Sequence, residues 1–228
     1  MSLANIREET LGIIQEVSGK VDLNRANILK YINNGYKAFV RDTNCIEDRI
    51  DITSVANQFE YSKADAANIA YIYRINEVRH IMSGVSEVGR PLTPLQGGYG
   101  GLPEDYSYGR PYHYWTRGML SEDLTTNSAK RFGVWPIDSA SGNTIRLHVN
   151  RMPAADLTSG SDAPEIPSAW HEAISFYAGM SIFRRYSHLN QNWHRKYLDL
   201  RAEYQELVNN YISNMSVEYT ELQTITEI

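Results

Sequence analysis

The sequence predicts an α+β protein: an antiparallel helical bundle from the N- and C-terminal segments, interrupted by an inserted antiparallel β-sheet or sandwich. Apolar residues recur with helical spacing near both ends of the chain, whereas residues 49–81 and 132–150 contain stretches of alternating polar and apolar residues. The 228 residues, 42% of them hydrophobic, suffice for a large core. We expect the bundle to comprise residues 1–44 and 165–212, the β-rich insertion residues 45–164, and a C-terminal arm residues 213–228.

The N-terminal segment contains two predicted helices. The first is short and amphipathic, over residues 6–17. The second begins after Asp22 or Asn24, either of which can cap it, and its apolar residues between Ile28 and Val40 form one stripe. Gly35 lies within this stripe and costs about 1 kcal/mol relative to alanine in a helix. We therefore expect a close contact at Gly35.

The insertion is predicted to contain five strands, over residues 49–53, 58–61, 69–81, 132–137 and 144–150. Residues 64–70 could instead form a helical turn. The small and polar residues 139–143 make a hairpin loop plausible between the last two strands. Between the third and fourth predicted strands, residues 84–130 are rich in glycine and tyrosine, and we expect a long loop with little regular structure there.

The C-terminal segment carries the strongest helical pattern. One helix opens at Pro167 and Ser168, residues 187–190 interrupt it, and a second helix follows with apolar residues spaced 4-3-4-3-4. The short break favours an antiparallel hairpin. The residues expected to pack along its seam are Trp170, Tyr177, Trp193, Tyr197, Leu200, Tyr204, Leu207 and Tyr211.

A cluster of basic residues surrounds the predicted helix–helix corner: Arg184, Arg185, Arg195, Lys196 and Arg201, against Asp199 alone. This cluster could be an ordinary solvated corner. Alternatively it is a basic edge that meets an acidic partner and steers association. On the second interpretation, Arg184, Arg185, Arg195 and Lys196 contact another subunit or another component of an assembly.

Residues 213–228 contain three glutamates and no basic residue, together with scattered apolar side chains. Such a segment is either a frayed terminus or an arm that becomes ordered on a neighbouring molecule. If it is an arm, its anchors are Tyr219, Leu222, Ile225 and Ile228.

No motif indicates catalysis or a cofactor. The single Cys45 cannot form an intrachain disulfide, and His171–Ser175 lacks the second histidine of a metalloprotease helix. His188 and His194 are too far apart to share a helical face, and Gly97–Gly101 lacks the lysine of a phosphate-binding loop. A catalytic pair assembled from distant segments is left open. We expect no metal and no cofactor.

Composition argues against a duplex-binding or membrane protein. The net charge of −5 lacks the basic excess with which proteins grip DNA, and no apolar run approaches the length of a membrane span. Tyrosine supplies 16 of the 25 aromatic residues, and tyrosine is enriched at protein–protein interfaces. The composition therefore favours a chain that contacts other proteins.

The order of these signals resembles the head-to-tail connector (adaptor) proteins of tailed bacteriophages, of the podophage type. The resemblance covers residues 22–212 and depends on the order of its parts rather than on any single motif. Those parts are residues 28–36, residues 41–45, residues 58–61, residues 69–81 before the Gly89-Arg90-Pro91-Leu92 turn, residues 144–153, and residues 157–173 from the linker to the helix start at Trp170-His171-Glu172-Ala173. The long stretch 84–130 departs from the family pattern, which leaves its role open.

The resemblance implies a structural virion protein. Members of the family form a homo-oligomeric ring, typically of twelve copies, under the portal protein, and join the capsid to a downstream neck or tail protein. DNA passes through the channel without specific binding. The helices would build the ring, the β-insertion would face the tail, and the C-terminal segment would reach the portal. We expect synthesis in the host cytoplasm and incorporation into the virion neck.

Two other functions stay open. A stopper or tail-terminator ring protein is close in class and differs in whether it binds portal. A carbohydrate- or surface-binding β module is more distant, and is suggested by the tyrosines and tryptophan of residues 99–115.

Overall fold

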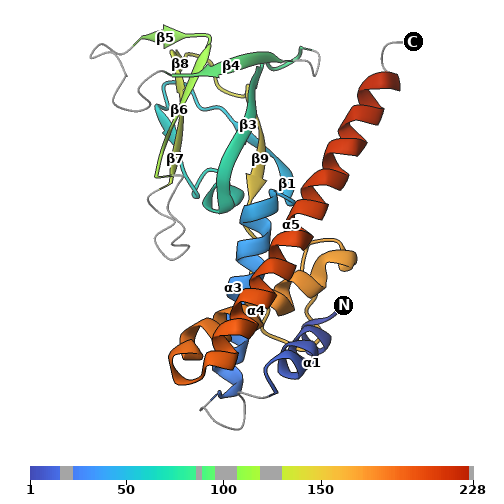
Figure 1. Cartoon of the computed structure of the whole chain (residues 1–228). Helices are drawn as coiled ribbons and strands as arrows, with labels where there is room; N and C mark the ends of the chain where they lie inside the picture. The colour runs from blue at the N-terminus through green and yellow to red at the C-terminus, as the bar shows by residue number, and fades with distance from the viewer. Residues whose placement is uncertain (16–22, 86–88, 96–106, 119–129, 226–228) are drawn as a thin grey trace. The chain divides into compact units, whose positions relative to one another are not determined.

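The computed structural model describes residues 1–15, 23–85, 89–95, 107–118 and 130–225, with the backbone alone for residues 216–225 (Figure 1). The chain divides into two compact units. A helical unit comprises Met1–Cys45 and Ala155–Ile228, and a β unit comprises Ile46–Ala154. The predicted α+β class is confirmed, while the antiparallel bundle arrangement stays a prediction.

The helical unit contains α1 (Leu3–Ile13), α3 (Arg25–Thr43), α4 (His171–Tyr186) and α5 (Gln191–Ile225). Short 3₁₀ turns, η4 (Ser168–Trp170) and η5 (Ser187–Leu189), precede α4 and α5. Asn24 is the cap of α3, because its side chain accepts a hydrogen bond of 2.9 Å from the backbone N–H of Asn27. Asn44 ends α3 in the left-handed conformation, at φ 56°.

Glycines let α4 approach its neighbours closely. A Cβ added at Gly35 of α3 would lie 2.8 Å from the carbonyl oxygen of Ile174 in α4, so the close contact expected at Gly35 is confirmed. Gly179 of α4 lies between Ile13 of α1 and Leu200 of α5, at 2.7 Å and 3.4 Å from a would-be Cβ. Helix α4 therefore packs between α1 and α5, and also against α3.

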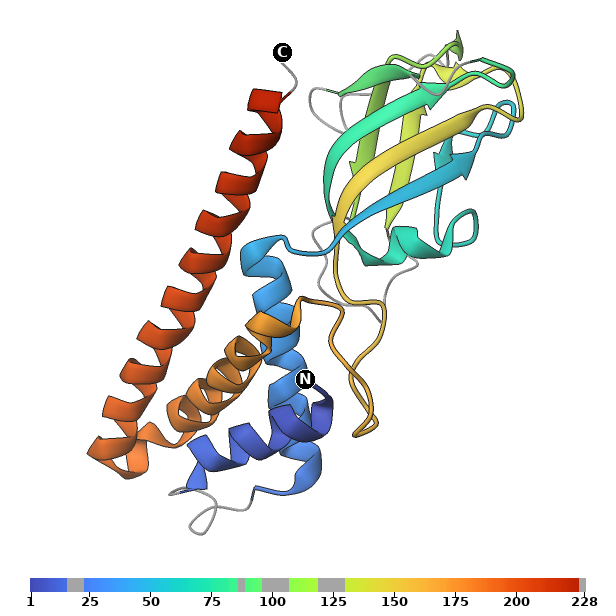
Figure 2. The same cartoon turned by 90° about the vertical axis from the view of Figure 1, so that its right-hand side faces the viewer.

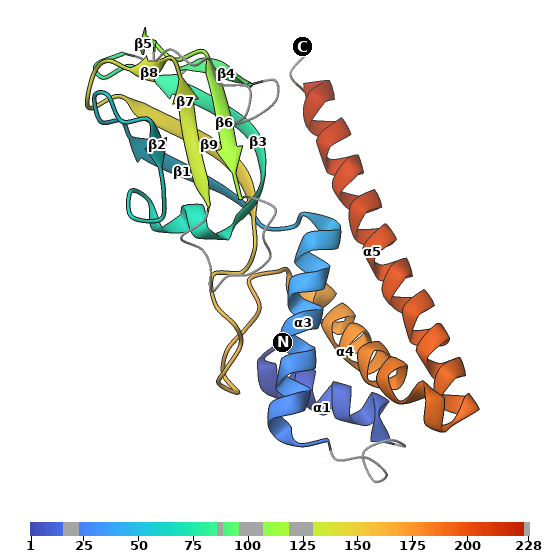
Figure 3. The same ribbon diagram turned by 90° about the vertical axis from the view of Figure 1, so that its left-hand side faces the viewer.

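The β unit contains one large curled sheet and one small one (Figures 2 and 3). The large sheet has the strand order β1-β9-β3-β4-β6-β7-β2, and the two-stranded sheet pairs β5 with β8. The strand bounds are β1 Glu47–Thr53, β2 Glu60–Tyr61, β3 Ile72–Ile81, β4 Arg90–Pro94, β5 Tyr108–Gly109, β6 His113–Arg117, β7 Arg131–Trp135, β8 Ile137–Asp138 and β9 Thr144–Arg151; a 3₁₀ turn, η1 (Ala67–Tyr71), precedes β3.

Two sequence expectations for the insertion were wrong. Residues 84–130 contain β4, β5 and β6 instead of a loop with little regular structure, and residues 90–92 of the expected turn at Gly89–Leu92 belong to β4 itself. Residues 139–143 do not close a hairpin, because β8 pairs with β5 and β9 pairs with β1 and β3. The large sheet is antiparallel-rich, as expected, with one parallel pair, β4–β6; the small sheet is the parallel pair β5–β8.

The sequence analysis missed strand β4 because the strand contains prolines, which argue against a strand in the local pattern. The backbone N–H groups of Thr93 and Leu95 donate to the carbonyls of Tyr112 and Tyr114, at 3.1 Å and 2.7 Å. Pro94 lies between these two donors, where the parallel pairing requires no N–H. Pro94 therefore does not interrupt the pairing of β4 with β6, because the register places it where no N–H donor is needed.

The curl of the sheet brings its two ends onto one core. Ile50 and Ile52 of β1, Leu147 of β9, and Phe132 and Val134 of β7 belong to the same buried cluster. Outside this cluster, Trp115 of β6 is 1% exposed and lies against Gly133 of β7 and the ring of Phe59. The indole ring fills the space that a side chain at position 133 would need.

Replacing Gly133 by alanine is expected to destabilise the protein by about 3 kcal/mol through overpacking. The added Cβ would lie 2.2 Å from Cε2 of Trp115, a buried ring without room to move. The measurement is denaturant unfolding, and Gly12→Ala in α1 is the control, because nothing lies within 4 Å of a Cβ there. An unfolding midpoint unchanged in Gly133→Ala would contradict the packing of Trp115.

Candidate assembly surfaces

The α4–α5 hairpin is held by an aromatic seam. Of the eight residues expected there, Trp193, Leu200, Tyr204 and Tyr211 are buried, whereas Trp170, Tyr177, Tyr197 and Leu207 are half-buried. Val208, which the heptad pattern omits, is 3% exposed. The buried stripe follows the 3.6-residue period of a helix rather than a strict heptad, and so moves from position 207 to position 208.

Ring contacts along this seam join three helices. Tyr211 meets Trp170 and Phe39 edge-on, at centroid distances of 5.3 Å and 5.7 Å. Tyr204 meets Tyr177 at 5.2 Å, and its hydroxyl donates a hydrogen bond of 2.8 Å to Oδ2 of Asp42 in α3. Burial, and then this bond to a carboxylate, raise the pKa of Tyr204. The hydroxyl thus stays protonated and ties α5 to α3.

The predicted basic cluster lies where α4 turns into α5. Arg184, Arg185 and Arg195 are exposed, and Arg185 donates to the Tyr31 hydroxyl at 3.1 Å. Lys196 is half-buried, with its Nζ 6.0 Å from the ring centroid of Phe183. Within the described residues, no ion pair joins Arg184 or Arg195 to a carboxylate. Their charges are therefore available to a partner.

Beside this cluster lies a hollow of about 330 Å³ between α4 and α5, lined by Met180, Arg184, Tyr197, Arg201, Tyr204 and Gln205. No carboxylate lines it, and two guanidinium groups do. Arginine pairs with planar anions through two parallel hydrogen bonds. The hollow is thus suited to a carboxylate side chain of another molecule.

The expected C-terminal arm is not a separate segment, because α5 continues without a break to Ile225. Its 35 residues span about 52 Å at 1.5 Å per residue. Tyr211 is the last buried residue among the described side chains of α5, and Ile212 is already 47% exposed. Tyr219, Leu222 and Ile225 lie on this last part of the helix, and Ile228 lies outside the described residues.

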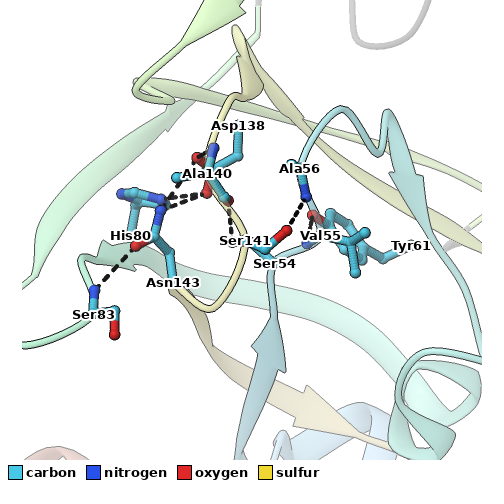
Figure 4. Close-up of polar contacts among 10 residues, drawn as sticks. All are labelled: Ser54, Val55, Ala56, Tyr61, His80, Ser83, Asp138, Ala140, Ser141 and Asn143. Carbon is cyan, nitrogen blue, oxygen red and sulfur yellow. Dashed lines mark hydrogen bonds and ion pairs between the residues drawn. The ribbon is translucent and has the colours of Figure 1, made fainter.

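A buried polar cluster lies in the β unit, and the sequence analysis missed it (Figure 4). Asp138 accepts from Asn143 Nδ2 at 3.0 Å and pairs with His80 Nε2 at 2.8 Å. The Asp138 and His80 side chains are 3% and 1% exposed. Burial raises the pKa of Asp138, but hydrogen bonds from Asn143, His80 and the Ala140 N–H outweigh it, so the pKa is lowered.

This cluster connects loops of the β unit. Asn143 Oδ1 accepts from the Ser83 N–H at 3.0 Å, and Ser54 Oγ donates to the carbonyl of Ala140 at 3.1 Å. The His80–Asp138 pair is buried, and the Ser54 hydroxyl also bonds to Asp138. No local signal could have revealed it, since residues 54, 80 and 138 meet only in the folded sheet.

The remaining candidate residues that the structure describes contribute to packing and to internal hydrogen bonds. His171 is buried, with Nε2 2.9 Å from the carbonyl oxygen of Ile166. Of the aromatic stretch 99–115, residues 99–106 lie outside the described residues, Trp115 is buried, and Tyr114 stacks on Phe132 at 5.9 Å. Lys130, also unforeseen, is buried and donates to the Ile72 carbonyl at 2.8 Å.

Among the described residues, no group of three or more His, Cys, Asp and Glu side chains could hold a metal ion. No helix in the same part of the chain is long and apolar enough to cross a membrane.

Two features are typical of a structural protein that binds other proteins. One is the helical hairpin with its basic hollow, and the other is the extension of α5 beyond its packed part. The model of the SU10 adaptor protein family matches residues 1–221. The chain belongs to the SU10 adaptor protein family, a family of phage head-to-tail adaptors. It is therefore an adaptor-type structural protein of a bacteriophage, as the resemblance found in the sequence indicated. No curated protein matches the chain in sequence.

Proposed function

We propose that the chain is a head-to-tail adaptor that forms a closed ring under the portal, joins the capsid to the neck or tail and surrounds the DNA channel. The observation that carries the proposal is the family match over residues 1–221, which spans the hairpin and nearly all of α5. Twelve copies is the expected number. The net charge of −5 suits a channel along which DNA slides without being held.

A ring requires two different surfaces on each copy, because its contacts are head-to-tail. The helical unit offers two candidates on different helices, since α1 and α5 both pack on α4. The basic hollow lies between α4 and α5, whereas α1 carries the exposed carboxylate Glu8 beside Arg7. This carboxylate and the hollow are complementary, which supports a head-to-tail contact between helical units.

The portal is the expected partner of the end of α5. Tyr219, Leu222 and Ile225 are spaced three residues apart, so they lie on one side of the helix. With Ile228, they are the proposed anchors. Arg184, Arg185, Arg195 and Lys196 are the proposed contact with a neighbouring subunit or with the portal.

The double variant Arg184→Glu, Arg195→Glu is expected to weaken ring assembly roughly tenfold at 0.1 M salt, and less at 0.5 M, since exposed charges are screened. Both side chains are exposed, so the fold should be unchanged. The control is Lys30→Glu, Lys63→Glu, which makes the same change in charge at exposed positions elsewhere. The measurement is the midpoint concentration of assembly by mass photometry; equal midpoints for the two variants would refute the contact.

The function itself is tested by the native mass of the purified chain, alone and with purified portal rings. We expect a complex with one adaptor ring per portal. A chain that stays monomeric and does not bind portal would refute the proposal. A ring that forms but ignores portal would instead identify a stopper or tail terminator.

A further inference from the structure

Three loops meet at one end of the β unit. Thr53 at the end of β1 and Ile81 at the end of β3 both pair with Thr144 at the start of β9. The loops 54–57, 82–85 and 139–143 therefore leave the sheet side by side. The chain enters and leaves the unit at the other end of the same strands, where Glu47 pairs with Asn150.

This loop end exposes apolar side chains, and its described residues carry no charge; Glu87, in the same connection between β3 and β4, lies outside the described residues. Val55 is 49% exposed, Met82 41% and Val85 62%. Tyr108 of β5, which pairs with Ile137 just before the third loop, is 58% exposed. None of the residues 54–57, 82–85 and 139–143 is charged, in a chain in which 21% of residues are.

The buried polar cluster holds these loops in place (Figure 4). Asn143 binds the Ser83 N–H, and the Ala56 N–H donates to Ser141 Oγ at 2.8 Å. The Asn57 N–H donates to the carbonyl of Asp138 at 2.9 Å, and the Gly142 N–H to that of Ser54 at 2.9 Å. Every loop is thus bonded to another loop or to Asp138. Loops that are ordered in advance lose little entropy on binding, so a small contact on them is effective.

We propose that the loop end, defined by Val55, Met82, Val85 and Tyr108, is the surface through which each copy binds the next protein component of the virion, and that it binds an uncharged, apolar protein surface. The inference rests on the proposed adaptor function. It assigns the tail-side contact to specific residues.

The chemistry of the loop end favours a protein over DNA. Nucleic acid is bound mainly through its phosphates, which require lysine and arginine, and these loops have neither. An exposed apolar surface on a rigid support is typical of a protein contact.

The size of the loop end favours a repeated contact with a ring-shaped partner over pairing with a second copy. A stable two-protein interface uses about 20–30 residues on each side, and the loop end presents four apolar side chains. A single copy should therefore bind weakly. In a ring, all copies bind at once, and linked weak contacts gain affinity by factors of 10² or more.

The test uses phage heads that carry portal and adaptor ring, mixed with tails purified from the same phage. The variant Val55→Asp, Val85→Asp puts charge on the loop end at two well-exposed positions. The control, Ala64→Asp, Ala67→Asp, adds the same charge at exposed positions near the opposite end of the β unit, where Ile72 pairs with Arg151. Electron microscopy counts joined particles, and thermal unfolding of each variant checks the fold.

We expect joining to fall at least tenfold in the Val55/Val85 variant and to stay at the wild-type level in the control, while both rings still dock on portal. Normal joining by the Val55/Val85 variant would overturn the inference. Loss of ring formation in that variant alone would also overturn it, because the loop end would then bind a second copy. Failure of the wild-type ring to dock on portal would refute the proposed function instead.

Discussion

Deletion of residues 215–228 is expected to abolish binding to purified portal rings, by a factor of 100 or more, while the helical unit stays folded. The packing of α5 supports both parts of this expectation. Tyr211 is the last buried residue among the described side chains of α5, so the deletion removes no described buried side chain. The residues lost form the last 11 of the helix and the proposed anchors. Pull-down with portal measures binding, and circular dichroism measures the remaining helix.

A substitution series separates the role of the anchors from that of helix length. One triple variant keeps the chain length and removes the apolar side chains: Tyr219→Ser, Leu222→Ser, Ile225→Ser. Thr220→Ser, Gln223→Ser, Thr224→Ser is the control in the same stretch of helix. Only the first variant should lose portal binding. Portal binding by the truncated chain at wild-type strength would show that α5 docks elsewhere.

Replacement of Asp138 by alanine is expected to destabilise the protein by about 3 kcal/mol, because it removes a buried carboxylate and leaves its hydrogen-bond donors unsatisfied. The change leaves His80 Nε2 and Asn143 Nδ2 buried without their acceptor. Asp65→Ala is the control: this aspartate also accepts hydrogen bonds, from Ser62 and Gln58, but it is exposed. We expect it to cost about 1 kcal/mol or less. Urea unfolding at pH 7 compares the two, and equal losses would contradict the role given to the cluster.

The same carboxylate predicts a dependence on pH. The pKa of Asp138 is lowered in the folded protein, so its ionised form contributes stability at pH values above its unfolded pKa of about 3.9. That contribution is lost as the pH falls through the folded pKa. The difference in unfolding free energy between wild type and Asp138→Asn should therefore be largest near pH 7 and shrink below about pH 4. A difference that widens in acid would contradict this sign.

The local pattern of the chain determined its helices and longer strands. Asn24 caps α3 because its side chain reaches an N–H three residues ahead, which is a property of neighbouring residues alone. Gly35 was recognised as a contact because a glycine is costly inside a helix. β1 and β9 were found from their alternation, since one face of each is buried in the core.

The same local reasoning failed where a partner strand or helix decides the outcome. β5 is two residues long and exists only because β8 lies beside it. The continuation of α5 through the expected arm was also missed, although residues 213–225 contain neither glycine nor proline to end a helix. The change of composition at Ser213 was given more weight than the absence of a helix breaker.

The sequence by itself determined the α+β class, the helical hairpin, its basic corner and the adaptor family, because period, charge and order along the chain are visible without coordinates. Only the tertiary structure decided that Arg184 and Arg201 line one hollow, and that His80, Asp138 and Asn143 hold three loops together. His80 and Asp138 are 58 positions apart along the chain. Burial and hydrogen bonding in the folded chain bring them together, and neither leaves a periodic trace in the sequence.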